Sequence, residues 1–428
     1  MLFRSVHPSL YPLRIGHTHI LNQGETGPVG TRVITLDEYM DPPDFGRGYD
    51  PHWALSDSFQ WLPTDFQVSK TGKVKALGYI NNLHPVHHKE TYGTVARLLE
   101  RFLPLFENVV ADTLGPERPH AIQVDPLHWY DGLPTEEEDD AAHEHEDADA
   151  STMDADWQWY SYEQRICWPI IPDPKPFAPP ANADARRPAF SLAGRTLQVI
   201  VKLANVVLTP DNPRYPGGAW HVEGMLNERI VATGIYYYAC ANITESRLAF
   251  RMTVGADDPY EMMGTYKQYA QDDVQGTAAA WGIARDRPLN QEIGHVVAEE
   301  GKCVAFPNVY QHCVMPFELD DWGQPGYRKV LCFFLVDPTN RVLSTSTVVP
   351  QQEAWLEDVE VVRAAMPALR AKGVSKRRRE EVVQSAREAG MGREEAEAVR
   401  EQFMRERSQF VVHQAQEVYE LEFNMCEH

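Results

Sequence analysis

The sequence lacks long apolar runs. No stretch of about 18 apolar residues, the minimum for a membrane-spanning helix, occurs anywhere in the chain. Residues 1–16 are interrupted by His, Ser and Pro and do not contain the continuous apolar segment of a secretory signal. We therefore expect neither a membrane span nor a membrane partner.

Basic residues are also few. The chain has 40 Lys and Arg against 62 Asp and Glu, which gives a formal net charge of −22. An acidic protein repels phosphate backbones, so nucleic acid is excluded as a general partner. The short basic run Lys376–Arg379 is followed by two glutamates and is typical of a solvated helix face.

Paired cysteines are missing as well. The six cysteines are scattered, contain no CxxC pair and form no dense disulfide framework. Four of them lie in apolar, strand-like segments, where a buried free thiol is the usual state. This usage favours a reducing compartment, and we expect the cytoplasm.

The chain divides by composition into three regions. Residues 1–194 are predicted to form an irregular and helical N-terminal region that packs on the core. It contains a helix over 90–112, which Pro104 should kink or divide, and an acidic low-complexity loop over 132–156. Residues 351–428 are predicted to be a C-terminal helical region, docked on the core or used for a partner, for example in a homodimer.

The middle region, 195–350, is mainly β in pattern. Strand-like segments rich in β-branched residues are separated by turn signals, without regular helices between them. The pattern predicts an antiparallel barrel or sandwich. The expected strands cover 195–210, 229–240, 246–254, 302–309 and 328–338.

One short stretch carries the chemistry. In GGAWHVEGM, residues 217–225, His221 and Glu223 are two positions apart. In a strand such residues point the same way with Cα atoms ~6.5 Å apart, so both side chains can bind one metal ion. His312, in the later segment VYQHCVMP, offers a third ligand. Two histidines and one carboxylate that leave open positions form the pattern of non-haem Fe(II) sites.

These residues carry a family resemblance. His221-x-Glu223, then His312, then Arg328 at the start of the next strand, resemble the iron(II)- and 2-oxoglutarate-dependent oxygenases. Residues 195–345 resemble their double-stranded β-helix, a jelly-roll or cupin-like fold. More narrowly, YINNLHPVHHKETYG, YPGGAWHVEGMLNERI and ITESRLAF resemble a group of uncharacterised fungal proteins, the DUF4246 group.

The resemblance implies a cofactor and cosubstrates. Fe(II) would be bound by His221, Glu223 and His312, and 2-oxoglutarate and O2 would be consumed. Arg328 is the candidate for the far carboxylate of 2-oxoglutarate, because a guanidinium forms a charged fork that matches a carboxylate. Asn205 and Arg251 are further candidates for contacts to the cofactor. Glu223 stands where the family more often has Asp, and it remains a competent ligand.

The resemblance also implies a reaction. The enzyme would hydroxylate or desaturate a small molecule, such as an amino acid or a specialised metabolite, while 2-oxoglutarate is decarboxylated to succinate. Alternatives stay open at this point. A cupin-type metal enzyme, either a 2-oxoglutarate-independent iron dioxygenase or a zinc hydrolase, could use the same three ligands. A protein hydroxylase and a non-catalytic binding protein are the other two.

Overall fold

The computed structural model describes residues 6–24, 27–39, 52–114, 188–254, 278, 282–370 and 374–423. The predicted acidic loop 132–156 lies outside these residues. The chain forms two compact units, and the candidate site belongs to the first, made of Met1–Glu117, Ala185–Phe250 and Gly294–Gln414. Within the part that the structure describes, no helix is long and apolar enough to cross a membrane.

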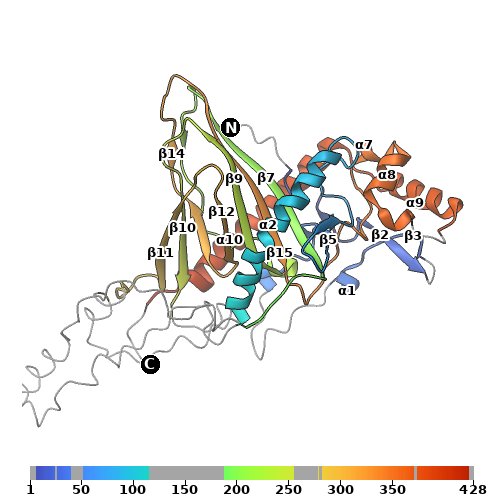
Figure 1. Ribbon diagram of the computed structural model, residues 1–428. Helices are drawn as coiled ribbons and strands as arrows, with labels where there is room; N and C mark the ends of the chain where they lie inside the picture. Colours follow the sequence, from blue (N-terminus) through green and yellow to red (C-terminus); the bar gives the residue numbers. More distant parts are fainter. Residues whose placement is uncertain are drawn as a thin grey trace, which may run out of the picture. The chain divides into compact units, whose positions relative to one another are not determined.

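The main sheet has six antiparallel strands in the order β12-β9-β15-β7-β5-β6 (Figure 1). Its long central strands match the predicted segments. Two strands come from the N-terminal region, where the sequence analysis expected none. The strands are β5 (Thr64–Val68), β6 (Val74–Ala76), β7 (Thr196–Leu208), β9 (Ile230–Ala241), β12 (Cys303–Pro307) and β15 (Gly326–Val336).

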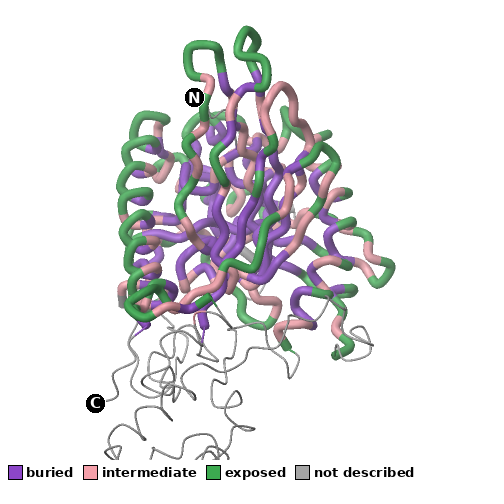
Figure 2. The backbone as a smooth tube through the Cα atoms, turned by 90° about the vertical axis from the view of Figure 1, so that its left-hand side faces the viewer, coloured by how far each residue is buried: buried purple, intermediate pink, exposed green. Residues whose placement is uncertain are grey.

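Both faces of this sheet are covered, which explains the nearly continuous apolar sequence of its central strands. On β15, Phe333 packs in the core beneath helix α2 (Lys89–Leu114), whereas its neighbour Phe334 packs in a second core on the other face. Figure 2 shows the buried residues gathered in the interior and the exposed ones toward the outside. The sheet therefore separates two cores, and the candidate site lies on the side of the second.

Helix α2 is a single helix. It continues through Pro104, so the expected division there does not occur. Its apolar face meets β9 closely at Gly234, where an added Cβ would lie 2.7 Å from the ring of Phe102. A glycine at this point of β9 thus lets the aromatic side of the helix approach the sheet.

Smaller sheets complete the β structure. Among the described residues, four smaller sheets have the strand orders β11-β10-β13, β1-β4, β2-β3 and β8-β14. The described strands form separate sheets and no closed barrel. The mainly β core is confirmed, and the double-stranded β-helix stays a prediction. The strands are β1 (Leu13–Arg14), β2 (His19–Gly24), β3 (Gly27–Val33), β4 (Phe59–Gln60), β8 (Arg214–Tyr215), β10 (Arg247–Thr253), β11 (Asn290–Val297), β13 (Gln311–Val314) and β14 (Phe317–Glu318).

The C-terminal region is helical, as predicted. Helices α7 to α9 form a small apolar cluster of their own with Tyr79. The last helix, α10, packs into the second core, where Phe403 stacks on Phe59 with 4.9 Å between ring centroids. The homodimer through these helices stays a prediction. The helices are α1 (Leu36–Tyr39), α7 (Glu353–Leu356), α8 (Val359–Ala365), α9 (Lys376–Glu388) and α10 (Arg393–Gln414).

Candidate metal centre

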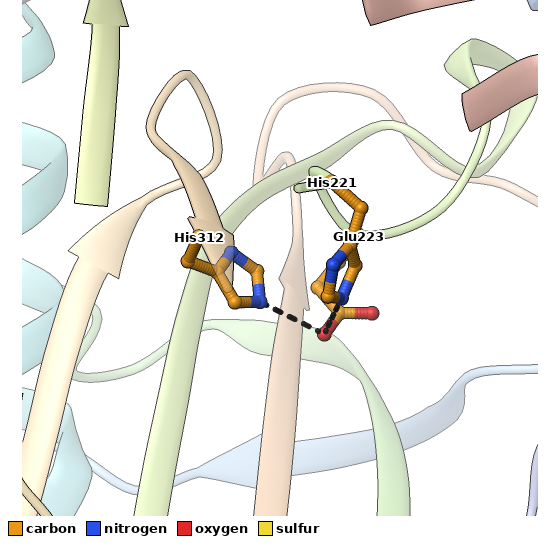
Figure 3. A group of neighbouring side chains, drawn as sticks. All are labelled: His221, Glu223 and His312. Carbon is orange, nitrogen blue, oxygen red and sulfur yellow. Dashed lines mark ion pairs between the residues drawn. The ribbon is translucent and has the colours of Figure 1, made fainter. Parts of the chain in front are cut away.

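The structure brings the three predicted ligands together. One ligand atom each from His221, Glu223 and His312 lies within 4.8 Å of the other two. Nε2 of His312 is 3.5 Å and Nε2 of His221 is 3.8 Å from the same carboxylate oxygen of Glu223. Figure 3 shows both imidazole rings turned toward that carboxylate. The sequence spacing alone did not establish this convergence.

The segment that carries His221 and Glu223 is not the strand that the sequence suggested. His221 makes a single antiparallel bridge to His312, with backbone hydrogen bonds of 3.2 and 2.9 Å, and the chain then bends. Gly224 has a φ of +76°, a left-handed conformation that favours glycine. The bridge places the two histidines opposite each other, and the bend turns Glu223 toward them.

Asn308 holds Glu223 in place, and it was not among the predicted site residues. Its side-chain oxygen accepts a hydrogen bond of 2.9 Å from the Glu223 amide, and its amide group donates to the Glu223 carbonyl at 2.8 Å. These bonds substitute for the strand pairing that the bend removes. The only local signal was its position in the Phe-Pro-Asn turn after β12.

The imidazole of His221 is oriented for metal binding. Its Nδ1 lies 2.8 Å from the Ala219 carbonyl oxygen, which can only accept a hydrogen bond. Nδ1 therefore carries the proton, and the Nε2 lone pair is left toward Glu223. Burial, followed by the charge of His312, lowers the pKa of His221 to about 4, so the ring is neutral at pH 7. A neutral imidazole is the form that binds a metal.

Glu223 is ionised although it is buried, with 7% of its surface exposed. Burial by itself would raise the pKa of this carboxyl group. The charge of Lys202 and the hydrogen bond with His312 outweigh burial and hold the pKa well below its usual range. The centre thus presents two imidazoles and one carboxylate.

A cavity of about 280 Å³ opens onto the centre from the side of α10. Lys202 on β7 lines it, together with His7 and Trp61 from the N-terminal region. Burial, together with the charges of Lys202 and Arg400, lowers the pKa of His7 to about 3, so this imidazole is neutral. None of these lining residues was predicted, because only the folded chain places them next to the triad.

Arg328 is buried, with 7% of its surface exposed. One guanidinium nitrogen donates a 2.8 Å hydrogen bond to the Ser246 hydroxyl, and the group lies 5.6 Å from the ring centroids of Tyr237 and Phe317. Its Nε has no hydrogen-bond partner, and no carboxylate pairs with it, within the described ranges. This is an uncompensated buried cation on the face of β15 that carries Cys332.

The strand register separates Arg328 from Asn205. Arg328 is opposite Val206 and Cys332 is opposite Lys202, so Arg328 and Lys202 share one face of the sheet. Asn205 is opposite Lys329 and faces the other way, where it accepts a 3.0 Å hydrogen bond from the Tyr238 hydroxyl. The structure does not bring Asn205 to the triad.

Arg251 belongs to the second unit. Its guanidinium forms an ion pair of 2.8 Å with Glu420, and the arginine side chain is 8% exposed. This is the pairing with an acid that a buried arginine on a polar strand face commonly makes. This ion pair lies within the second unit, whereas the triad belongs to the first.

Residues 1–359 match a family described as "Protein of unknown function (DUF4246)". The chain belongs to the DUF4246 family. The match includes all three residues of the triad and Arg328, and the family's description names no activity. None of the curated proteins matches the chain significantly.

Three solved structures show weak similarity to this DUF4246 protein. The Fe(II)/α-ketoglutarate-dependent dioxygenase TqaL has a TM-score of 0.20 and 12% identity, over 42% of this chain and 52% of that one. The IDO of Bacillus thuringiensis has a TM-score of 0.19 and 11% identity, over 33% of this chain and 47% of that one. A bsmA homolog from Methylobium petroleophilum PM1 has a TM-score of 0.19 and 8% identity, over 33% of this chain and 42% of that one. The alignments span about half of these chains or less, and scores this low assign neither fold nor activity.

Proposed function

We propose that this protein is a non-haem iron(II)- and 2-oxoglutarate-dependent oxygenase that hydroxylates or desaturates a small molecule. The observation that carries the proposal is the convergence of His221, Glu223 and His312 beside a cavity. Two imidazoles and one carboxylate with open positions are the ligand set of non-haem Fe(II) oxygenases. The strands of the first unit would then form the double-stranded β-helix of such enzymes.

The side chains present fit Fe(II). His221 is neutral and correctly protonated, Glu223 is ionised, and both histidines direct Nε2 to one point. A bound Fe(II) would supply the oxygen chemistry that protein side chains lack. In the hydroxylation, 2-oxoglutarate loses CO2, one atom of O2 enters succinate and the other enters the substrate.

Other residues would orient the metal ligands and bind the cosubstrate. The Ala219 carbonyl and Asn308 hold two of the ligands in place, a role that outer-shell groups commonly have at metal sites. Arg328 would receive the far carboxylate of 2-oxoglutarate. A buried guanidinium without a carboxylate is costly, and a bound dicarboxylate would satisfy its unpartnered Nε. The proposal assigns neither Asn205 nor Arg251 to the cosubstrate.

The test is an anaerobic titration of Fe(II) and 2-oxoglutarate into metal-free protein, followed by visible absorption. We expect a weak metal-to-ligand charge-transfer band that requires both components and that His221→Ala abolishes. Arg328→Ala should retain Fe(II) and weaken 2-oxoglutarate binding about 30-fold or more, because it removes one partner of a buried charge pair. Arg214→Ala, at an arginine with 70% side-chain exposure, is the matched control and should bind normally.

If Fe(II) binds and 2-oxoglutarate adds no band, the proposal is wrong in its cosubstrate. The 2-oxoglutarate-independent iron dioxygenase and the zinc hydrolase would then take its place, since neither requires Arg328. If the band forms, succinate produced with small-molecule or protein extracts separates a small-molecule oxygenase from a protein hydroxylase.

A further inference from the structure

Part of the cavity wall is formed by α10. Met404 and Phe410 of this helix line the cavity, together with residues of the segment Ala219–Gly224 and with Lys202 and Trp61. The family match ends at residue 359, so α10 lies entirely beyond the matched residues. The residues that bind the metal and those that close the cavity therefore come from different parts of the chain.

Helix α10 is fixed in position by an ion pair and by aromatic contacts. Arg407 of α10 forms a buried ion pair with Glu228, and its guanidinium carbon lies 3.6 Å from the ring centroid of Trp61. Further along the helix, Phe410 stacks on Trp53 with 5.9 Å between centroids. Such contacts at successive turns fix α10 over the cavity, which is a preformed site and not a gap in a loose surface.

One cation that lines the cavity has no directly bonded anion among the described residues. Lys202 makes no hydrogen bond or ion pair within the described parts of the chain, and its ammonium lies 5.7 Å from the ring centroid of Phe334. The charge of Arg407 is neutralised by Glu228. The carboxylate of Glu223 is near Lys202, but the proposed function commits it to the metal. An incoming anion is the group that would complete this arrangement.

We propose that this cavity is the substrate site and that it takes a small organic anion. Its anionic group pairs with Lys202, and its apolar part packs against Met404 and Phe410 of α10. The volume of about 280 Å³ is at the small end for ligand pockets, which fits a compact molecule. The inference rests on the proposed function in placing the substrate beside the metal, and it adds the substrate's chemical class.

Matched pairs of probes test the charge. Binding of phenylacetate and hexanoate is compared with that of phenylacetamide and hexanamide by calorimetry, on metal-free and on anaerobic Fe(II)-loaded protein. We expect each carboxylate to bind at least about 10-fold more tightly than its amide. Lys202→Met should remove this difference and Lys202→Arg should restore it. Lys329→Met, on the opposite face of the same sheet, should leave it unchanged.

A second pair of variants tests the helix. Met404 is 37% exposed at the cavity, and Val412 is 53% exposed elsewhere on α10. Met404→Glu should weaken carboxylate binding by repulsion, whereas Val412→Glu should not.

Three results would overturn the inference. The carboxylates could bind no better than the amides, the preference could survive in Lys202→Met, or Lys202→Met could lose the 2-oxoglutarate band while probe binding stays intact. The last result would assign Lys202 to the cosubstrate. A different pattern identifies failure of the proposed function alone: Fe(II) does not bind, yet the Lys202-dependent preference for carboxylates persists in metal-free protein.

Discussion

At the scale of single residues, the region around the centre depends on charges that are buried in defined partnerships. Glu228 is fully buried, pairs with Arg407 and accepts hydrogen bonds from the amides of Trp61 and Met225. Arg328 is also buried, and no carboxylate in the described part of the chain forms an ion pair with it. Glu228 and Arg407 neutralise each other and form a structural pair, whereas Arg328 has no such anion among the described residues and suits an anionic ligand.

Arg407→Ala should destabilise the protein strongly. It leaves the buried carboxylate of Glu228 without its cation, and breaking a buried pair in this way costs about 3–5 kcal/mol. Urea unfolding followed by circular dichroism measures the change. Arg405→Ala, at an exposed position of the same helix, is the control and should stay within about 0.5 kcal/mol of the wild type. Equal stability of the two variants would contradict a structural role for the pair.

His7 should make stability depend on pH. Its folded pKa of about 3 is below its ordinary value of 6.5, mainly because of burial. Between these two values the unfolded chain binds a proton that the folded chain does not, so stability is lost as the pH falls from 6.5 toward 3. At pH 5 the loss from this group is about 2 kcal/mol.

The measurement compares urea unfolding at pH 7 and pH 5. His7→Gln should show a smaller loss between these two values than the wild type, because glutamine does not titrate. His17→Gln, at an exposed histidine, should retain the loss seen in the wild type. If His7→Gln loses as much stability as the wild type, His7 is not the group responsible.

At the scale of elements, the extended segment 217–225 decides whether the ligands meet. Gly224 permits the bend because glycine readily adopts its φ of +76°. A larger residue would also clash there, since an added Cβ would lie 2.7 Å from both Oε2 of Glu228 and Cδ1 of Ile230. Gly224→Ala should cost more than the ~1–2 kcal/mol of a strained left-handed residue, and should weaken Fe(II) binding by shifting Glu223.

Gly301→Ala is the matched control for this substitution. Gly301 has a φ of +86°, and an added Cβ would have nothing within 4 Å. Gly301→Ala should therefore lose only the folding stability that the strained backbone costs, and its Fe(II) affinity should be unchanged. Equal effects of the two variants on stability and on metal affinity, both measured by calorimetry, would show that the contacts at Gly224 are unimportant.

At the scale of the whole molecule, the main sheet depends on parts of the chain that lie far from it in sequence. Phe333 and Phe334 are both fully buried, one in the core beneath α2 and the other in the core that contains α10. The strands of the predicted middle region, 195–350, are therefore covered by residues from both flanking regions.

A fragment of residues 195–350 should not fold cooperatively. It lacks α2, α10 and β5, so apolar side chains on both faces of the sheet would meet water. Thermal unfolding by circular dichroism and binding of a hydrophobic dye compare the fragment with the full chain. A sharp transition in the fragment would establish 195–350 as an independent domain, which is the predicted boundary.

Much of the candidate centre was visible in the sequence. His221, Glu223, His312 and Arg328 stood out as a set, through their order, spacing and strand context and the family resemblance that they carry, although each alone is ordinary. The central strands and α2 were visible because their apolar residues repeat with a strand or helix period. Lys202 and Asn308 gave no such signal, because a lysine on a strand or an asparagine in a turn is ordinary.

Side-chain chemistry was enough to predict the types of ligand, and local periodicity was enough to predict the mainly β middle region and the helical end. The folded chain was needed to show that a bend, and not a strand, brings Glu223 to the histidines, that Asn205 faces away, and that residues of α10 line the cavity. The reason is physical: a side chain's neighbours across a sheet or beneath a helix depend on register and packing between distant segments, which local sequence does not encode.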